Sequence, residues 1–218
     1  LKHKRSEFLY IDQTPLASAS LGQVHKATLL NGNEVVIKVL KPNIDEDFDR
    51  DFAILHFVFK LLSNFKKINQ RIDLMKLLHE FTTITGDELN LQREIDVAKE
   101  FKEHFKNFSY IKIPHIYEEL CSEKIIVMEE IKGDKLNNID SWIERNNDPQ
   151  KIAKNIIEAY VEQLLYLQIL HYDPHPGNII ILENSKIAIL DFGMSGIITD
   201  EMKEGVIDAL FAFSERDH

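Results

Sequence analysis

The sequence predicts an α+β fold in which a small β-rich lobe with extra helices is followed by part of a mainly helical large lobe. Three observations predict it: β-branched segments around a turn between residues 24 and 40, apolar residues at helical spacing across 45–108 and 150–170, and a short apolar hairpin at 179–190. With 218 residues, 44% of them apolar, the chain suits one large domain or two lobes that share a cleft. We place the boundary so that 1–130 is the small lobe with inserted helices and 131–218 is the truncated large lobe.

The first strands form a predicted hairpin with an unusual lysine. Residues 24–30 and 34–40 flank the turn Asn31-Gly32-Asn33. Successive side chains of a strand point to opposite faces, so Lys38 lies on the face opposite Val35 and Ile37, together with Val36 and Leu40. Burying a lysine on an apolar face is unfavourable unless an anionic group meets it. The alternative is an edge-strand lysine that points into solvent.

Residues 45–108 have helical periodicity. One apolar stripe consists of Phe52, Leu55, Phe59 and Leu62, and further stripes occur at 74–81 and 91–105. Gly86 is expected to bend or separate the last helix. On that helix Glu88 and Glu94 are six residues apart (94 − 88 = 6) and lie on different faces. Glu94 lies next to the apolar stripe of this helix, as the helix glutamate of a kinase does, so we choose it as the partner of Lys38. The alternative is that Glu94 lies on a solvated face of the helix. The spacing 94 − 38 = 56 leaves room for at least one extra helix on this lobe.

A polar loop at 171–178, just before the second hairpin, carries the residues most typical of a catalytic site. Asp173, Asn178 and Asp191 have offsets of 178 − 173 = 5 and 191 − 178 = 13, which fit the H-x-D-x-x-x-x-N loop and the D-F-G of protein kinases. Phosphoryl transfer requires such a set: Asp173 would orient the attacking hydroxyl, and Asn178 and Asp191 would hold Mg²⁺ across the phosphates. The alternative is an ordinary hairpin, since Asp, Asn, Pro and Gly all favour turns. Turn chemistry explains each residue singly but not the ordered set.

The segment 15–25 precedes the first predicted strand, where protein kinases have a glycine-rich loop that closes over the phosphates. Here it carries Ala17, Ser18, Ala19 and Ser20, with Gly22 as its one glycine. Small side chains still permit a close approach to the nucleotide, but the loop should be stiffer than a glycine-rich one. We expect these four residues and Lys38 to contact the nucleotide.

Further strands are expected at 111–116 and 124–128, and a buried helix at 150–170. Between them Glu129 begins a crossing segment, 129–134, whose backbone groups can bind adenine. After Gly193 the chain runs directly to a helix with Thr199 as its expected cap. A long activation segment and an Ala-Pro-Glu motif are missing from the sequence, which argues for a small or lipid-like substrate, or for none.

Composition excludes several classes of protein. A net charge of −10 argues against a nucleic-acid binder. The single cysteine, Cys121, excludes an internal disulfide, fits a reducing compartment and is expected to be a small core residue. The apolar run at 52–59 is too short to cross a bilayer, and residues 1–7 do not resemble a signal peptide. The sequence reads as part of a longer protein that is cytoplasmic or membrane-associated, with any membrane span outside this part.

Four segments taken together resemble the UbiB-like, or ABC-one, atypical kinases: 15–25, 36–39, 171–178 and 190–194. The likeness extends over most of the chain. It implies a two-lobed protein-kinase-like fold, binding of ATP or ADP with Mg²⁺, and ATPase or phosphotransferase activity. It also implies a link to ubiquinone or other isoprenoid-lipid metabolism at membranes, and with it a lipid or quinone-precursor ligand.

The resemblance also implies roles for single residues. Lys38 would contact phosphates, Glu94 would pair with it, Asp173 would be the catalytic aspartate, and Asn178 and Asp191 would hold magnesium. The family's E-x-D motif is represented by Glu88-Leu89-Asn90, so Glu88 remains as a nucleotide-site residue while an amide replaces the aspartate. The family's upstream Lys-x-Gly-Gln segment does not occur in this sequence.

Three alternatives remain beside the ATP-dependent phosphotransferase or ATPase. A nucleotide-binding pseudokinase would regulate a lipid or protein partner without transferring phosphate. An aminoglycoside- or choline-type phosphotransferase shares the catalytic-loop pattern, but the alanine-rich segment speaks against it. His171 and His175 are four residues apart (175 − 171 = 4) and allow a zinc site, whereas we expect His171 to brace the loop by hydrogen bonds.

Overall fold

The structure is a computed structural model that describes residues 4–18, 21–63 and 73–214. The chain divides into two compact units. Unit 1 consists of Leu1–Arg93 and Ile116–Glu130, and unit 2 of Glu94–His115 and Ile131–His218. The segment 94–115 is thus grouped with unit 2, and the lobe boundary placed after residue 130 stays a prediction. The combination of sheets and helices confirms the predicted α+β class.

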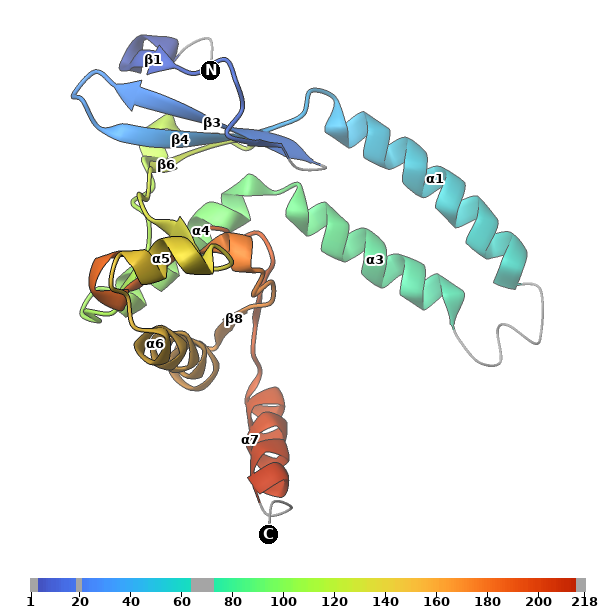
Figure 1. Cartoon of the computed structure of the whole chain (residues 1–218). Coiled ribbons are helices and arrows are strands. Elements are labelled where there is room, and N and C mark those ends of the chain that lie inside the picture. The colour runs from blue at the N-terminus through green and yellow to red at the C-terminus, as the bar shows by residue number, and fades with distance from the viewer. Residues whose placement is uncertain (1–3, 19–20, 64–72, 215–218) are drawn as a thin grey trace. The chain divides into compact units, whose positions relative to one another are not determined.

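Unit 1 is built on an antiparallel sheet in the order β1-β3-β4-β6, with β2 also paired to β3 (Figure 1). The strands are β1 (Phe8–Ile11), β2 (Ala17–Ser18), β3 (Gly22–Leu29), β4 (Glu34–Leu40) and β6 (Ile125–Glu129). In the β3–β4 turn Gly32 has φ +86°, which glycine adopts without steric strain, and Leu29 N donates to Asn33 O at 2.9 Å. The hairpin predicted for 24–40 is confirmed.

One face of this sheet carries the core of unit 1. Val35 and Ile37 are 0% and 1% exposed and pack in one cluster with Phe8, Leu29 and Val127. Half-buried Cys121 packs against the same cluster, as expected for a small core residue. Lys38 belongs to the opposite, half-buried face because successive side chains of a strand alternate. The strand therefore keeps the lysine charge out of the apolar core, where it would be costly.

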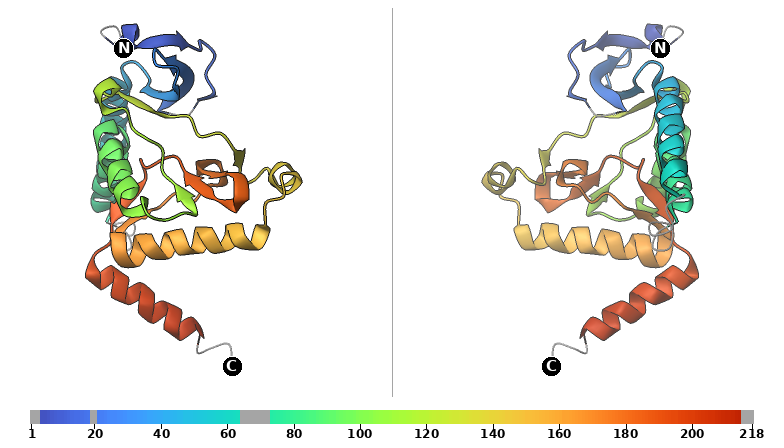
Figure 2. Two further views of the ribbon diagram at one scale, coloured as in Figure 1. Left: turned by 90° about the vertical axis from the view of Figure 1, so that its left-hand side faces the viewer. Right: turned by 90° about the vertical axis from the view of Figure 1, so that its right-hand side faces the viewer.

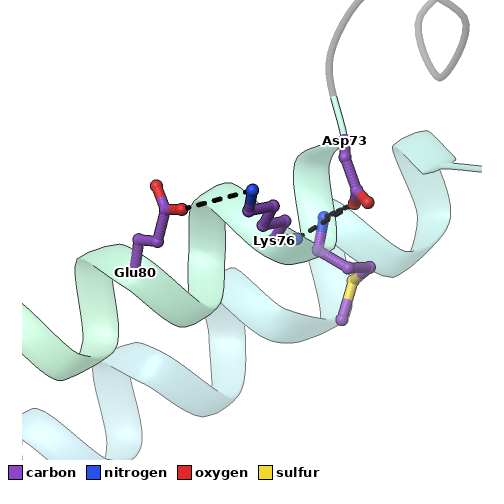
Figure 3. Close-up of polar contacts among 4 residues, drawn as sticks. Asp73, Lys76 and Glu80 are labelled. Carbon is purple, nitrogen blue, oxygen red and sulfur yellow. Dashed lines mark hydrogen bonds and ion pairs between the residues drawn. The ribbon is translucent and has the colours of Figure 1, made fainter. Parts of the chain in front are cut away.

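Two helices of unit 1, α1 (Ile44–Ser63) and α3 (Leu74–Glu88), lie side by side (Figures 1 and 2). Phe52 and Phe81 meet edge to face across them, with ring centroids 5.8 Å apart. Asp73 caps α3, since its Oδ1 accepts from the backbone N of Met75 and Lys76 at 3.1 and 3.0 Å (Figure 3). The prediction of at least one extra helix before Glu94 is confirmed.

The predicted division of the helical region is partly wrong. Gly86 lies inside α3, and the chain breaks instead at Leu89-Asn90 before α4 (Leu91–Phe105). Asn90 starts α4, because its carbonyl and side-chain oxygens accept from Arg93 N at 3.0 and 3.4 Å. Glu88 and Glu94 are therefore on two helices, not on two faces of one. A glycine is tolerated in an exposed helix at modest cost, whereas a capping asparagine favours a new start.

Unit 2 contains a four-stranded sheet in the order β5-β10-β9-β7 and a two-stranded sheet of β11 and β8. The strands are β5 (Ile111–Lys112), β7 (Asp134–Lys135), β8 (Ile169–His171), β9 (Ile179–Ile181), β10 (Ile187–Ile189) and β11 (Ser195–Ile197). Its helices are α4, α5 (Ile139–Glu144), α6 (Pro149–Glu162) and α7 (Asp200–Ser214). The predicted strand at 111–116 shortens to Ile111–Lys112 and pairs parallel to β10. Thr199 caps α7 as expected, since its Oγ1 accepts from Met202 N at 3.2 Å.

The helix expected at 150–170 ends early and is not fully buried. α6 stops at Glu162, a single π-helical stretch follows at Gln163–Leu167, and Gln168 turns left-handed (φ +56°) into β8. α6 runs along one side of the β9–β10 hairpin, as Figure 2 shows, and α6 contacts β10. Ile157 and Val161 face outward, 64% and 42% exposed. The prediction of a fully buried helix is therefore wrong, because part of the apolar surface of α6 is exposed. Within the described ranges, no helix is long and apolar enough to cross a membrane.

Candidate active site

The loop between β8 and β9 brings Asp173 and Asn178 together. A short 3-10 helix, Pro176–Asn178, ends the loop and leads into β9. Asn178 Nδ2 donates to Asp173 Oδ2 at 2.9 Å and to Asp173 O at 3.4 Å. Because the amide nitrogen faces the aspartate, the amide oxygen, Oδ1, is directed elsewhere and can accept another ligand.

Asp191 lies at the same end of the β9–β10 hairpin. Ile179 pairs with Ile189, and Leu190 N donates to Asn178 O at 3.0 Å, so Asn178 and Asp191 leave adjacent strand ends. Asp191 Oδ1 accepts from Gly193 N at 3.0 Å, which fixes the carboxylate against its own turn. The structure thus groups Asp173, Asn178 and Asp191, the three residues that sequence spacing had singled out.

His171 anchors the backbone at Asp191 and so helps to hold this group in place. It is 2% exposed, its Nε2 hydrogen-bonds Asp191 O, and its ring meets Phe192 edge to face at 6.2 Å. Phe192 in turn contacts Phe101 of α4 at 5.0 Å between centroids. The expectation that His171 braces the loop by hydrogen bonds is confirmed.

Two residues of this region were missed by sequence reasoning. Gln163, in the π-helical stretch, is 0% exposed, and its Oε1 accepts from the backbone N of His171 at 3.0 Å. Its only signal was an amide inside an apolar helix. Tyr160 of α6 is close enough to Asp173 to feel its charge: burial and the Asp173 carboxylate together raise the pKa of the Tyr160 hydroxyl to about 12.

Glu94 is placed in the same unit, in the first turn of α4, and is 4% exposed. A Cβ built on Gly193 would lie 3.3 Å from Asp191 Oδ1 and 3.5 Å from Glu94 Oε2. The two carboxylates therefore border the same small space beside Gly193. A buried glutamate next to a second carboxylate favours cations nearby, since either charge alone is unfavourable inside a protein.

The remaining predicted residues lie in unit 1. Ala17 pairs with Val24, and Val24 pairs with Lys38, so Ala17 and Lys38 share one sheet face. Ser18 pairs with Gln23 and belongs to the other face. Gly22 allows the close approach of β3 and β4, because a Cβ there would lie 2.5 Å from Val39 O. Ala19 and Ser20 lie outside the described residues.

Two further unit 1 predictions concern glutamates. Glu129 ends β6 and pairs with Val35, so its side chain belongs to the core face and not to the face of Lys38. A nucleotide contact from Glu129 would therefore come from its backbone. Glu88 is the last residue of α3, and its side chain lies outside the described residues. Lys38, Ala17, Ser18, Glu129 and Glu88 are thus in unit 1, whereas Glu94, Asp173, Asn178 and Asp191 are in unit 2.

Comparison with known proteins identifies the family. Residues 2–218 match the family described as the ABC1 atypical kinase-like domain. The chain belongs to this family. Among its ABC1 relatives, the probable protein kinase UbiB of Pseudomonas aeruginosa is 30% identical over 97% of this chain and 40% of its own length. The Arabidopsis thaliana protein Activity of bc1 complex kinase 8, chloroplastic, is 33% identical over 94% of this chain and 28% of its own.

A solved structure supports the same assignment. The Rv3197–erythromycin complex from Mycobacterium tuberculosis has a TM-score of 0.70 and 27% identity, covering 89% of this chain and 48% of that one. The kinase-like fold and the resemblance to UbiB-like ABC1 proteins are therefore confirmed. The chain spans less than half the length of these relatives, at 28% to 40% for the two curated ones.

Proposed function

We propose that this ABC1 domain binds ATP or ADP together with Mg²⁺ and transfers or hydrolyses the terminal phosphate. One observation carries the proposal: Asn178 is hydrogen-bonded to Asp173 at 2.9 Å while Asp191 leaves the adjacent strand end of the same hairpin. This is the arrangement that phosphoryl transfer requires of an acceptor-orienting carboxylate and a metal-binding pair. Kinase-like ancestry supports the reaction class.

The donor atoms fit magnesium. Asn178 Oδ1 and the Asp191 carboxylate are hard oxygen ligands, and Mg²⁺ usually binds one or two carboxylates and keeps water and phosphate oxygens in its other positions. Within the described ranges no group of three or more His, Cys, Asp or Glu side chains could hold a metal. When bound, Mg²⁺ would neutralise charge on the phosphate oxygens. Asp173 would orient the attacking hydroxyl or water and accept its proton.

The roles proposed for unit 1 follow the same template. Lys38 would bind phosphates and pair with Glu94, whose burial makes a cationic partner favourable. Ala17 on the Lys38 face, with Ser18, Ala19 and Ser20, would cover the phosphates. The backbone at Glu129 would bind adenine, and Glu88 would lie near the nucleotide.

For the phosphate acceptor we propose a small or lipid-like molecule, linked to isoprenoid-quinone or membrane-lipid metabolism. After Gly193 only a short connection containing β11 precedes α7, and β11 is paired with β8, so little chain is available to hold a peptide. The erythromycin complex of the M. tuberculosis relative is consistent with a small-molecule ligand. Membrane association of the whole protein, in a compartment that keeps Cys121 reduced, completes the proposal.

A second candidate is a pseudokinase that binds nucleotide and regulates a partner. The observation that favours it is Asn90, which replaces the aspartate of the family's E-x-D motif and serves to cap α4. Such a protein would bind ADP but release no phosphate from ATP, with or without lipid.

The test is nucleotide binding and phosphate release in the full-length protein, with and without Mg²⁺. Asp191→Asn should abolish the Mg²⁺-dependent part of nucleotide binding, and Lys38→Ala should weaken binding of ATP. Asp208→Asn on α7 and Lys151→Ala on α6 make the same changes at exposed positions and should bind as wild type does. Undiminished Mg²⁺-dependent turnover in Asp191→Asn would overturn the proposal, and binding without turnover in wild type would favour the pseudokinase.

A further inference from the structure

Unit 2 contains a cavity of about 630 Å³ at the turn end of the β9–β10 hairpin. Leu182, Glu183 and Asn184 of that turn line it, whereas Asn178 and Asp191 lie at the other end of the hairpin. Three paired residues on each strand, at about 3.3 Å per residue, put roughly 10 Å of sheet between the two ends. The cavity is therefore separate from the candidate active site, and its volume is typical of a small-molecule site.

The cavity is lined by four basic side chains and two acidic ones. The basic residues are Lys112, Lys132, Arg145 and Lys186, and the acidic ones are Asp134 and Glu183. Asp134 is 8% exposed: Ser141 Oγ donates to its Oδ1 at 2.6 Å, and Arg145 Nε forms an ion pair with its Oδ2 at 3.3 Å. The excess of positive charge stands out because the whole chain carries a net charge of −10. A cavity of this sign attracts anions.

The wall of the cavity is held in a fixed, strained shape. Asn184 and Ser185 have φ values of +61° and +62°, which non-glycine residues rarely adopt. Three hydrogen bonds hold Ser185: its N donates to Asn147 Oδ1 at 2.7 Å, its Oγ accepts from Asp148 N at 2.8 Å, and its O accepts from Asn155 Nδ2 at 2.8 Å. Strained turns that are so firmly secured are typical of binding sites.

The rest of the lining offers donors beside an apolar floor. Asn147 is 6% exposed; its Oδ1 accepts from Ser185 N and its backbone N donates to Trp142 O. Within the described ranges its side-chain NH₂ group makes no hydrogen bond and remains as a donor at the cavity. Gly133 lets the backbone form the wall, since a Cβ there would lie 2.4 Å from Ile181 O. Phe108 and Ile111 supply apolar surface. The site thus combines cationic groups, an amide donor and a hydrophobic floor.

We propose that this cavity binds an amphipathic anion, that is, a molecule in which a phosphate or carboxylate group is attached to a hydrophobic body. The lysines and Arg145 would bind the charged group, and the apolar floor would take the body. Such a ligand can be a free metabolite or the headgroup region of an anionic lipid, and both share this chemistry. The proposal does not depend on the phosphoryl-transfer function, because none of the cavity residues belongs to the candidate active site.

The probe is 1-naphthyl phosphate, compared with uncharged 1-naphthol, in titration calorimetry on the full-length protein. We expect the phosphate to bind at least about tenfold tighter than naphthol and to weaken with added salt, as ion pairing does. Lys186→Glu should weaken binding of 1-naphthyl phosphate by about tenfold, since it replaces one positive charge at the site by a negative one. Lys151→Glu, an exposed change on α6, should leave it unchanged.

Two further arms separate this site from the other possibilities. Asp191→Asn should retain naphthyl phosphate binding, and ATP should not compete for it, if the cavity is a second site. Competition by vesicles that contain phosphatidic acid would assign the ligand to a lipid, and its absence would assign it to a soluble anion. Equal affinity for naphthol, an unaffected Lys186→Glu variant, or loss of binding in Asp191→Asn would each overturn the proposal.

Discussion

Replacing Gln163 by leucine tests whether this buried amide holds the catalytic loop in place. Gln163 is 0% exposed, and its Oε1 accepts from His171 N at 3.0 Å. Leucine is similar in size but cannot accept, so the His171 N–H would be buried without a partner. Such a loss costs about 1–3 kcal/mol.

A second term offsets part of this loss. Within the described ranges, Gln163 Nε2 is buried and has no hydrogen-bond partner. The substitution removes this unsatisfied donor and regains about 1 kcal/mol. We therefore expect Gln163→Leu to lower the free energy of unfolding by up to about 2 kcal/mol, the difference between the two terms.

Two measurements check this expectation. Urea denaturation should show the loss of stability, and hydrogen exchange should show faster exchange of the His171 amide in the native state. Gln150→Leu is the matched control, because Gln150 is exposed at the start of α6 and should change neither result. Unchanged protection of the His171 amide in Gln163→Leu would refute the role assigned to this side chain.

Three further predictions follow from the same structure. Gly193→Ala should lower turnover more than stability, because its Cβ would press on Asp191 Oδ1 at 3.3 Å; equal kcat in the two proteins would contradict this. Gly86→Ala should stabilise unit 1 by about 0.5–1 kcal/mol as a helix-interior change, whereas Gly32→Ala, at φ +86°, should destabilise it; denaturation midpoints that shift in the same direction would refute the pair. The pKa of Tyr160 is about 12 in the fold against 10.0 ordinarily, so the unfolded chain loses this proton first and stability should fall as pH rises from 10 to 12. Tyr160→Phe should flatten that part of the pH–stability curve, and an equally steep decline would contradict the assignment.

Sequence patterns predicted the elements that depend on local chemistry. The Asn-Gly turn and the β-branched residues around it predicted the β3–β4 hairpin, and the spacing of Asp173, Asn178 and Asp191 predicted a cluster that the hairpin register then produced. Spacing sufficed because a single hairpin joins all three residues.

The contacts that join distant segments could not be predicted in the same way. Nothing in the sequence indicates that Glu94 borders Gly193, since that contact depends on how α4 packs. Gly86 was expected to bend or separate the helix, but an exposed helix tolerates glycine, and the chain breaks at Leu89-Asn90. The π-helical stretch at Gln163–Leu167 was missed because its apolar residues continue the pattern of α6. The side-chain direction of Glu129 required the register of β6 against β4.

The short turn between β3 and β4 controls more than the path of the chain. Adding or deleting one residue among Asn31, Gly32 and Asn33 would shift the pairing by one position, and every side chain of β4 would exchange faces. Lys38 would then enter the space filled by Val35 and Ile37, and an aliphatic side chain would replace the ammonium group beside Ala17. The turn that sets the register of the hairpin therefore also decides which face of the sheet carries Lys38.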